Sequence, residues 1–202
     1  MARGPKSSIR LEIAAEAARL LAEHGDLDYH SARQKAARRL GYSNNRLLPD
    51  NNEIEMALQR HQSIFSLAGQ TDTLGRLRRL AAEAMESLQA FSPRLVGPVL
   101  SGTASSNSPI QLHLFPETPE DVMFHLMEKN IPWVEREVQL KFSNGSRERR
   151  PVLRFLAGDT DIELYILKPA EQRNPPLGKI DERPEKGAPL SRLLELIALD
   201  QR

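Results

Sequence analysis

Apolar residues recur at helical spacing through the first 90 positions of the chain. Ser8 is a favoured helix cap, and Gly25 is a favoured stop for the helix that follows it. Asp50, with Glu53 three residues later, forms a capping-box pattern at the start of another apolar stripe. The pattern predicts four helices joined by short loops, over residues 8–25, 31–40, 50–65 and 74–88.

The pattern changes to short β-like runs after Phe91. Thr118-Pro119 predicts a helix start between two such runs, because threonine caps well and proline suits the first helical position. Apolar and polar residues then alternate as in a half-buried antiparallel strand, with Arg136 the only charge on the apolar side. Asn144-Gly145 is the favoured dipeptide of a type I′ hairpin. Strands are predicted over residues 95–100, 110–115, 134–142, 152–156 and 161–167.

These elements predict an α+β fold, with a helical N-terminal region and a mixed or antiparallel sheet. The helical region covers residues 1–70, and the sheet with its helices covers residues 71–167. A proline-rich connector and a last helix complete the chain over residues 168–202. That helix is expected to pack through Leu193, Leu194 and Ile197.

Composition narrows the class of protein. The 202 residues carry a formal net charge of +1, so no global field draws the chain to nucleic acid or membrane. The chain has no cysteine, which excludes disulfides, thiolate nucleophiles and cysteine-bound zinc. No apolar run approaches the length of a membrane span, and charges interrupt the N-terminal region. We therefore expect a cytoplasmic protein with no membrane partner.

One region resembles a known family. The order helix, strand, Gly102-Thr103, strand, helix and strands, over residues 73–167, resembles the core of the nucleotidyltransferase superfamily, the polymerase-beta-like fold. The N-terminal half of the chain is also similar to uncharacterised bacterial nucleotidyltransferase-like proteins. In the family, a strand ends in Gly-Ser or a similar pair, a second strand carries acid-x-acid, and a later strand supplies a third acid. Here Gln111-Leu112-His113 stands where acid-x-acid belongs.

This departure bears on the chemistry that the resemblance implies. The family's carboxylates hold two divalent ions, which neutralise charge during an in-line displacement. Gln111 is neutral, and His113 is a poor ligand for a hard ion that prefers oxygen. The sequence therefore favours a protein without the family's enzymatic activity, and any residual activity would use Mg²⁺ as cofactor.

The resemblance implies a nucleotide site at the Gly102-Thr103 turn and on the neighbouring strands. Gln111 and His113 alternate with apolar residues in one strand, as Glu163 does in another. If the two strands are neighbours in register, these three side chains share one face and could contact a base or ribose. The alternative is a solvated sheet face without a ligand. The nucleotide-binding candidates are Gly102, Thr103, Ser105, Gln111, His113 and Glu163.

A basic helix supplies a second candidate surface. Arg33, Lys35, Arg38 and Arg39 could follow an RNA backbone, although a solvated basic face explains the same pattern. The five histidines show no spacing typical of metal ligands, so no metal site is predicted.

Three functions remain open from the sequence. The first is a non-catalytic nucleotidyltransferase-like protein with a binding or regulatory role, whose ligand is a nucleotide or RNA. The second is a divergent metal-dependent transferase that uses Glu163 with Asp159 or Asp161. The third is an adaptor that binds a protein partner through its N-terminal helices.

Overall fold

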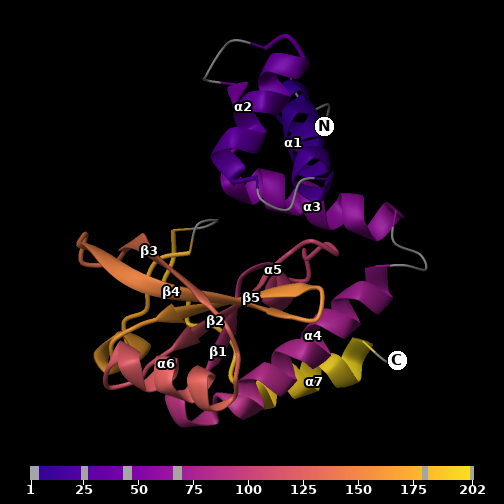
Figure 1. Ribbon diagram of the computed structural model, residues 1–202. Helices are drawn as coiled ribbons and strands as arrows, with labels where there is room; N and C mark the ends of the chain where they lie inside the picture. Colours follow the sequence, from indigo (N-terminus) through magenta and orange to yellow (C-terminus); the bar gives the residue numbers. More distant parts are fainter. Residues whose placement is uncertain (1–4, 24–26, 43–46, 66–69, 179–181, 201–202) are drawn as a thin grey trace. The chain divides into compact units, whose positions relative to one another are not determined.

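The computed structural model of the chain describes residues 5–23, 27–42, 47–65, 70–178 and 182–200. They form two compact units. In Figure 1 the first unit is drawn in indigo to purple, and the second in the colours from magenta to yellow. The first unit reaches to Gln70, and the second holds Thr71–Gly178 together with the chain from Glu182 onward. Each unit has a hydrophobic core of its own.

The first unit consists of three helices, α1 (Pro5–Glu23), α2 (Tyr29–Arg39) and α3 (Asn51–Phe65). Both α2 and α3 pack against α1. The core is made of aliphatic and small side chains that the three helices turn toward one another: Ile13, Ala14, Ala17, Leu20, Ala32, Ala36, Ala37 and Ile54.

Side-chain caps fix where these helices begin. The backbone N–H of Ser31 donates to the carboxylate of Asp28 at 2.9 Å, which starts α2. Asp50 and Glu53 exchange backbone-to-carboxylate hydrogen bonds of 2.8 Å each, so the predicted capping box of α3 is confirmed. Helix α1 begins at Pro5, and the predicted cap Ser8 lies inside it. Proline suits a first helical turn because its missing N–H has no partner to lose there. The predicted stop at Gly25 lies outside the described residues.

The second unit is built on a five-stranded mixed sheet. Its strands are β1 (Arg94–Val96), β2 (Ile110–Leu114), β3 (Val134–Lys141), β4 (Arg147–Ala157) and β5 (Thr160–Ile166). They lie in the order β1-β2-β5-β4-β3. Strands β2 and β5 run parallel, and the other three pairs are antiparallel.

Three helices cover one face of this sheet. Helices α4 (Gln70–Ser87), α6 (Pro119–Glu128) and α7 (Leu190–Asp200) lie on the same side of the strands in Figure 1. Leu112, Leu153 and Leu164 point toward them and are fully buried. Side chains alternate along a strand. The residues directly before and after each of these leucines in its own strand therefore lie on the opposite face of the sheet. We call this opposite face the polar face, and define it by Gln111, His113, Glu163 and Tyr165.

The predicted strand over residues 95–100 is wrong in its second half. Strand β1 ends at Val96, and a five-residue helix, α5 (Gly97–Ser101), follows. Pro98 cannot donate to a strand ladder, whereas its fixed φ suits a first helical turn. Gly97 has a φ of +70°, which turns the chain at the end of the strand.

Strand β3 forms as predicted, and its apolar side is partly buried at Val138 and Leu140 but exposed at its start. Val134 is 69% exposed, because the apolar side of β3 lies on the face opposite α4, α6 and α7. The hairpin after it is also longer than a type I′ turn. The N–H of Phe142 donates to the carbonyl of Ser146 at 3.0 Å, which leaves three residues between them.

The α+β fold class predicted from the sequence is confirmed, with helices at the N-terminus and a mixed sheet after them. Helix α7 packs through Leu193, which is fully buried, and Ile197 lies against the same core. Leu194 was expected to pack as well, but it is 47% exposed because it lies one residue off that stripe. Within the described parts of the chain, every helix is too short or too polar to cross a lipid bilayer.

Candidate functional site

The register of the parallel strands β2 and β5 brings the predicted polar residues together. Gln111 is the partner of Glu163, and His113 is the partner of Tyr165. All four side chains lie on the polar face, since their apolar neighbours fill the core on the other face. The expectation that Gln111, His113 and Glu163 share one face is therefore met by neighbouring strands in register.

Glu163 is the centre of a hydrogen-bond network on this face. The amide of Gln111 donates to one carboxylate oxygen at 3.0 Å, and the Tyr165 hydroxyl donates to the same oxygen at 3.2 Å. A guanidinium N–H of Arg136 donates to the other oxygen at 2.7 Å. Both oxygens of this buried carboxylate thus have donors, as a buried anion requires.

Arg136 reaches Glu163 from two strands away. It lies on β3 opposite Val152 of β4, and Val152 lies opposite Tyr165 of β5. Its long side chain crosses the buried Val152 to form the ion pair. The Arg136 side chain is about half exposed, with 49% of it accessible to solvent. The positive charge beside Glu163 is therefore that of a protein side chain and not of a bound ion, and it remains accessible to an anion.

The aromatic side chains of the polar face are buried in their neutral forms. Burial lowers the pKa of His113 to about 4, so the imidazole is uncharged at neutral pH. Its Nδ1 has no hydrogen-bond partner, and the ring meets Tyr165 edge to face at 5.7 Å between centroids. Burial also raises the pKa of Tyr165, and the charge of Glu163 adds to that shift. Tyr165 therefore acts as a hydroxyl donor at neutral pH.

The glycine that meets this network is Gly97, and not the predicted Gly102. A Cβ on Gly97 would lie 2.3 Å from Oε1 of Gln111, so a larger residue there would have to displace the end of that side chain. Gly102 instead ends α5 with a φ of +83° and faces Leu74 and Arg78 of α4. The strand predicted over residues 95–100 ends at Val96, so the glycine that follows the strand is Gly97, five residues before Gly102.

The remaining residues of the predicted turn form hydrogen bonds within their own loop. The Thr103 hydroxyl lies 2.8 Å from the hydroxyl of Ser101, and the N–H of Ser105 donates to the Ser108 hydroxyl at 2.9 Å. Thr103 is buried and Ser105 is partly buried. The structure thus brings together Gln111, His113 and Glu163 of the predicted set, and sets Gly97 rather than Gly102 against Gln111.

The donor atoms on this face do not fit the pair of hard divalent ions that the family resemblance implies. Glu163 is the one carboxylate of the network, and both its oxygens accept hydrogen bonds. Where the family resemblance implies the other two acids, this chain has the amide of Gln111 and the buried, neutral imidazole of His113. In the described part of the chain, no group of three or more His, Asp or Glu side chains is placed to hold an ion.

The two acids considered as substitutes each form an ion pair with an arginine. Asp161 accepts two hydrogen bonds from Arg154, at 2.8 and 2.7 Å, and this contact lowers the pKa of its carboxyl. Asp159 forms an ion pair of 3.0 Å with Arg76 of α4. Each of these carboxylates is paired with its own arginine, although Asp161 shares the polar face with Glu163 and Arg154 is the β4 partner of Glu163.

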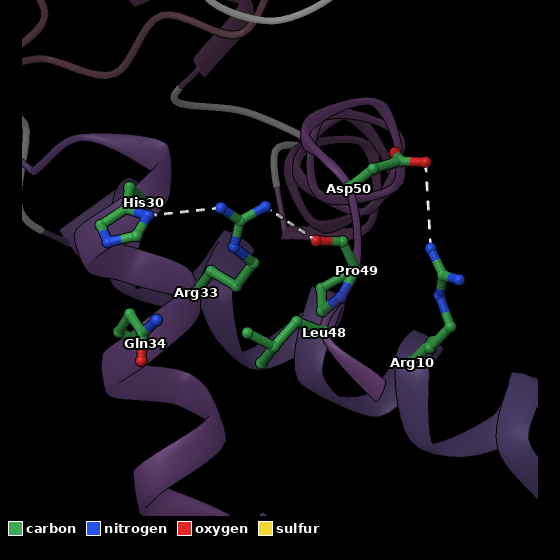
Figure 2. A pocket seen from close by; sticks show the side chains of 7 residues that line it. All are labelled: Arg10, His30, Arg33, Gln34, Leu48, Pro49 and Asp50. Atoms are coloured by element: carbon green, nitrogen blue, oxygen red, sulfur yellow. Dashed lines mark hydrogen bonds and ion pairs between the residues drawn. The ribbon is translucent and has the colours of Figure 1, made fainter. Parts of the chain in front are cut away.

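The basic residues of α2 do not form one continuous row. Arg33 turns into a pocket of the first unit, where it donates to the carbonyl of Pro49 at 3.1 Å and lies beside His30 (Figure 2). Arg39 forms an ion pair of 3.4 Å with Glu16. Lys35, Arg38 and Arg39 are all exposed on the surface of the same helix.

Sequence reasoning missed three members of the network, and each had a signal. Arg136 was visible as the only charge on the apolar side of its strand. Gly97 directly follows an apolar run and precedes a proline, which is typical of a strand end. Tyr165 shares its alternating face with Glu163. What the sequence could not provide was the reach of Arg136 across β4.

Comparison with known protein families and with curated proteins finds no match.

Proposed function

We propose that the chain is a degenerate relative of the nucleotidyltransferase superfamily, and that it binds a nucleotide on the polar face without catalysing transfer. The strand arrangement supports the relationship. A short strand precedes β2, a helix follows it, and β5, which carries the acid, runs parallel to β2. This is the order that the family resemblance implies.

One observation carries the proposal, namely the ion pair between Arg136 and Glu163. In the family, the acids of this face collect positive charge in the form of metal ions. Here a guanidinium supplies the positive charge directly, and a half-exposed arginine can also bind phosphate oxygens. The arrangement supports binding of an anionic ligand without a metal, since Glu163 and its neighbour Asp161 on the same face are each already paired with an arginine.

The contacts that the basic residues of α2 already make favour a nucleotide over RNA as the ligand. Arg33 is partly buried and donates to the carbonyl of Pro49, and the exposed Arg39 is paired with Glu16, so two of the four predicted cations are engaged within the first unit. A row of phosphates needs several accessible cations, whereas one nucleotide needs few. The divergent transferase is disfavoured because Asp159 and Asp161 are each paired with an arginine.

An NMR titration tests this proposal. We would add each of the four ribonucleoside triphosphates to the labelled protein in EDTA and follow the backbone amide shifts. The expected result is saturable change centred on Gly97, Gln111 and Glu163, since these residues border the network. No saturable change with any of the four, or changes confined to the first unit, would contradict the proposal.

A pair of glutamine variants localises the binding. Gln111→Leu removes the amide that joins Glu163 and Tyr165, and we expect it to weaken binding roughly tenfold, because a hydrogen bond to a charged group is lost. Gln139→Leu is the matched control, because Gln139 is exposed on β3. Equal affinities of the two variants would place the ligand elsewhere.

A further inference from the structure

The connector before α7 is tied to both edges of the sheet. At the β3 edge, the N–H of Leu177 donates to the carbonyl of Lys141 at 2.7 Å. Residues 182–185 then pair with this segment, as the N–H of Glu185 donates to the carbonyl of Pro176 at 2.8 Å. At the β1 edge, Ala188 and Leu95 exchange backbone hydrogen bonds of 2.8 and 2.9 Å. We call residues 182–188 the strap.

The strap passes over the β1 end of the polar face. Gly187 has a φ of +63°, and a Cβ there would lie 2.9 Å from the side chains of Arg94 and Val96. These two residues are the β1 partners of His113 and Gln111, so their side chains belong to the polar face. The close approach of Gly187 therefore places the strap directly against that face.

Glu185 is the residue that the strap presents to the network. Its carboxylate accepts a hydrogen bond from the backbone N–H of Gly97 at 3.2 Å, beside Gln111. Its charge also lies close enough to Tyr165 to add to the pKa shift that burial and Glu163 cause there. A negative group of the protein thus lies at the edge of the surface on which the nucleotide is proposed to bind.

We propose that the strap is an autoinhibitory element, in which the Glu185 carboxylate occupies the place over Gly97 that an anionic ligand must take. This inference rests on the proposed function, because it concerns access to the same face. Two negative groups cannot share one backbone donor without repulsion, so the ligand has to displace Glu185. Binding then includes the cost of breaking the contact with Gly97, and any partner that withdraws the strap would raise the affinity.

Two variants release the strap by different means. Glu185→Gln removes the negative charge and leaves the chain otherwise intact. Gly187→Ala keeps the charge but introduces a Cβ that would lie 2.8 Å from the Leu95 carbonyl, so the anchor at β1 must shift. Glu182→Gln is the matched control, because it removes an exposed strap carboxylate that pairs with Lys141 at the far edge.

The test measures ATP affinity in EDTA for the wild type and the three variants, together with hydrogen exchange at the Gly97 amide without ligand. We expect Glu185→Gln and Gly187→Ala to bind about tenfold more tightly than the wild type, since a charge-assisted contact no longer competes. Glu182→Gln should bind like the wild type. In Gly187→Ala the Gly97 amide should also exchange faster, because its acceptor has moved.

The possible failures are distinguishable. If the wild type binds ATP and both release variants bind it equally well, the strap is not inhibitory and the proposed function stands. If neither the wild type nor any variant binds, the proposed function fails and this inference fails with it. Should Gly187→Ala not fold, Glu185→Gln against Glu182→Gln still decides the question.

Discussion

At the scale of single residues, the polar face depends on how a buried carboxylate is neutralised. Glu163 has three donors, and one of them, Arg136, carries a full charge. Removal of one partner from such a pair leaves an uncompensated buried charge, whereas removal of both leaves two neutral groups. The coupling between the two side chains is therefore measurable.

A double-mutant cycle on this pair gives the first prediction. Arg136→Met should lower the free energy of unfolding by about 1–3 kcal/mol, because Glu163 stays buried without its cation. In Arg136→Met/Glu163→Gln part of that loss should return. Urea denaturation of the four proteins provides the comparison. Strictly additive effects would mean that the two side chains are not coupled in solution.

The buried imidazole of His113 gives the second prediction. Its pKa is lowered to about 4, so between roughly pH 6.5 and pH 4 the unfolded chain binds a proton that the folded protein does not. Stability must therefore fall as the pH drops through this window, by roughly 3 kcal/mol from this group. His113→Leu should remove this component from the pH dependence measured by urea denaturation. The same slope in wild type and variant would refute the burial of a neutral imidazole.

At the scale of elements, most helices and strands follow from the spacing of apolar residues. The capping box of Asp50 and Glu53 predicts the start of α3, and the alternation around Glu163 predicts β5. The length of β1 was missed because Leu95–Leu100 was interpreted as one short apolar run across the Gly97-Pro98 signal, and such a run does not by itself separate strand from helix. Tertiary contacts, and not the spacing of apolar residues, decide which face of a strand is buried. Alternation in β3 indicates two faces, but it does not say which face meets a packed layer.

The turn at the end of β1 gives the third prediction. Gly97→Ala and Gly145→Ala both place an alanine at positive φ, but only the first brings its Cβ against another side chain, Gln111. Both should lose about 1 kcal/mol for the left-handed backbone, and Gly97→Ala should lose more because Gln111 has to move. The difference in stability between the two variants, measured by thermal unfolding, gives the cost of the contact between a Cβ at position 97 and Gln111. If Gly97→Ala is as stable as Gly145→Ala, the close approach of Gly97 to Gln111 does not exist in solution.

At the scale of the whole molecule, the candidate site draws on segments far apart in the sequence. Gly97, Gln111, Arg136, Glu163 and Glu185 come from four strands or strand ends and from the strap. Sequence reasoning reached Gln111 and Glu163 because alternation and strand order placed them together. It could not reach Glu185, because a proline-rich connector carries no periodicity from which its path could be predicted.

The central claim is that Arg136, and not a metal ion, supplies the positive charge of a nucleotide site on the polar face. Calorimetric titration of the wild type and Arg136→Gln with ATP, in EDTA and again in Mg²⁺, tests it most directly. We predict that the wild type binds equally in both buffers, and that Arg136→Gln binds about tenfold more weakly in both. Binding that appears only with Mg²⁺, and that survives Arg136→Gln, would contradict the account.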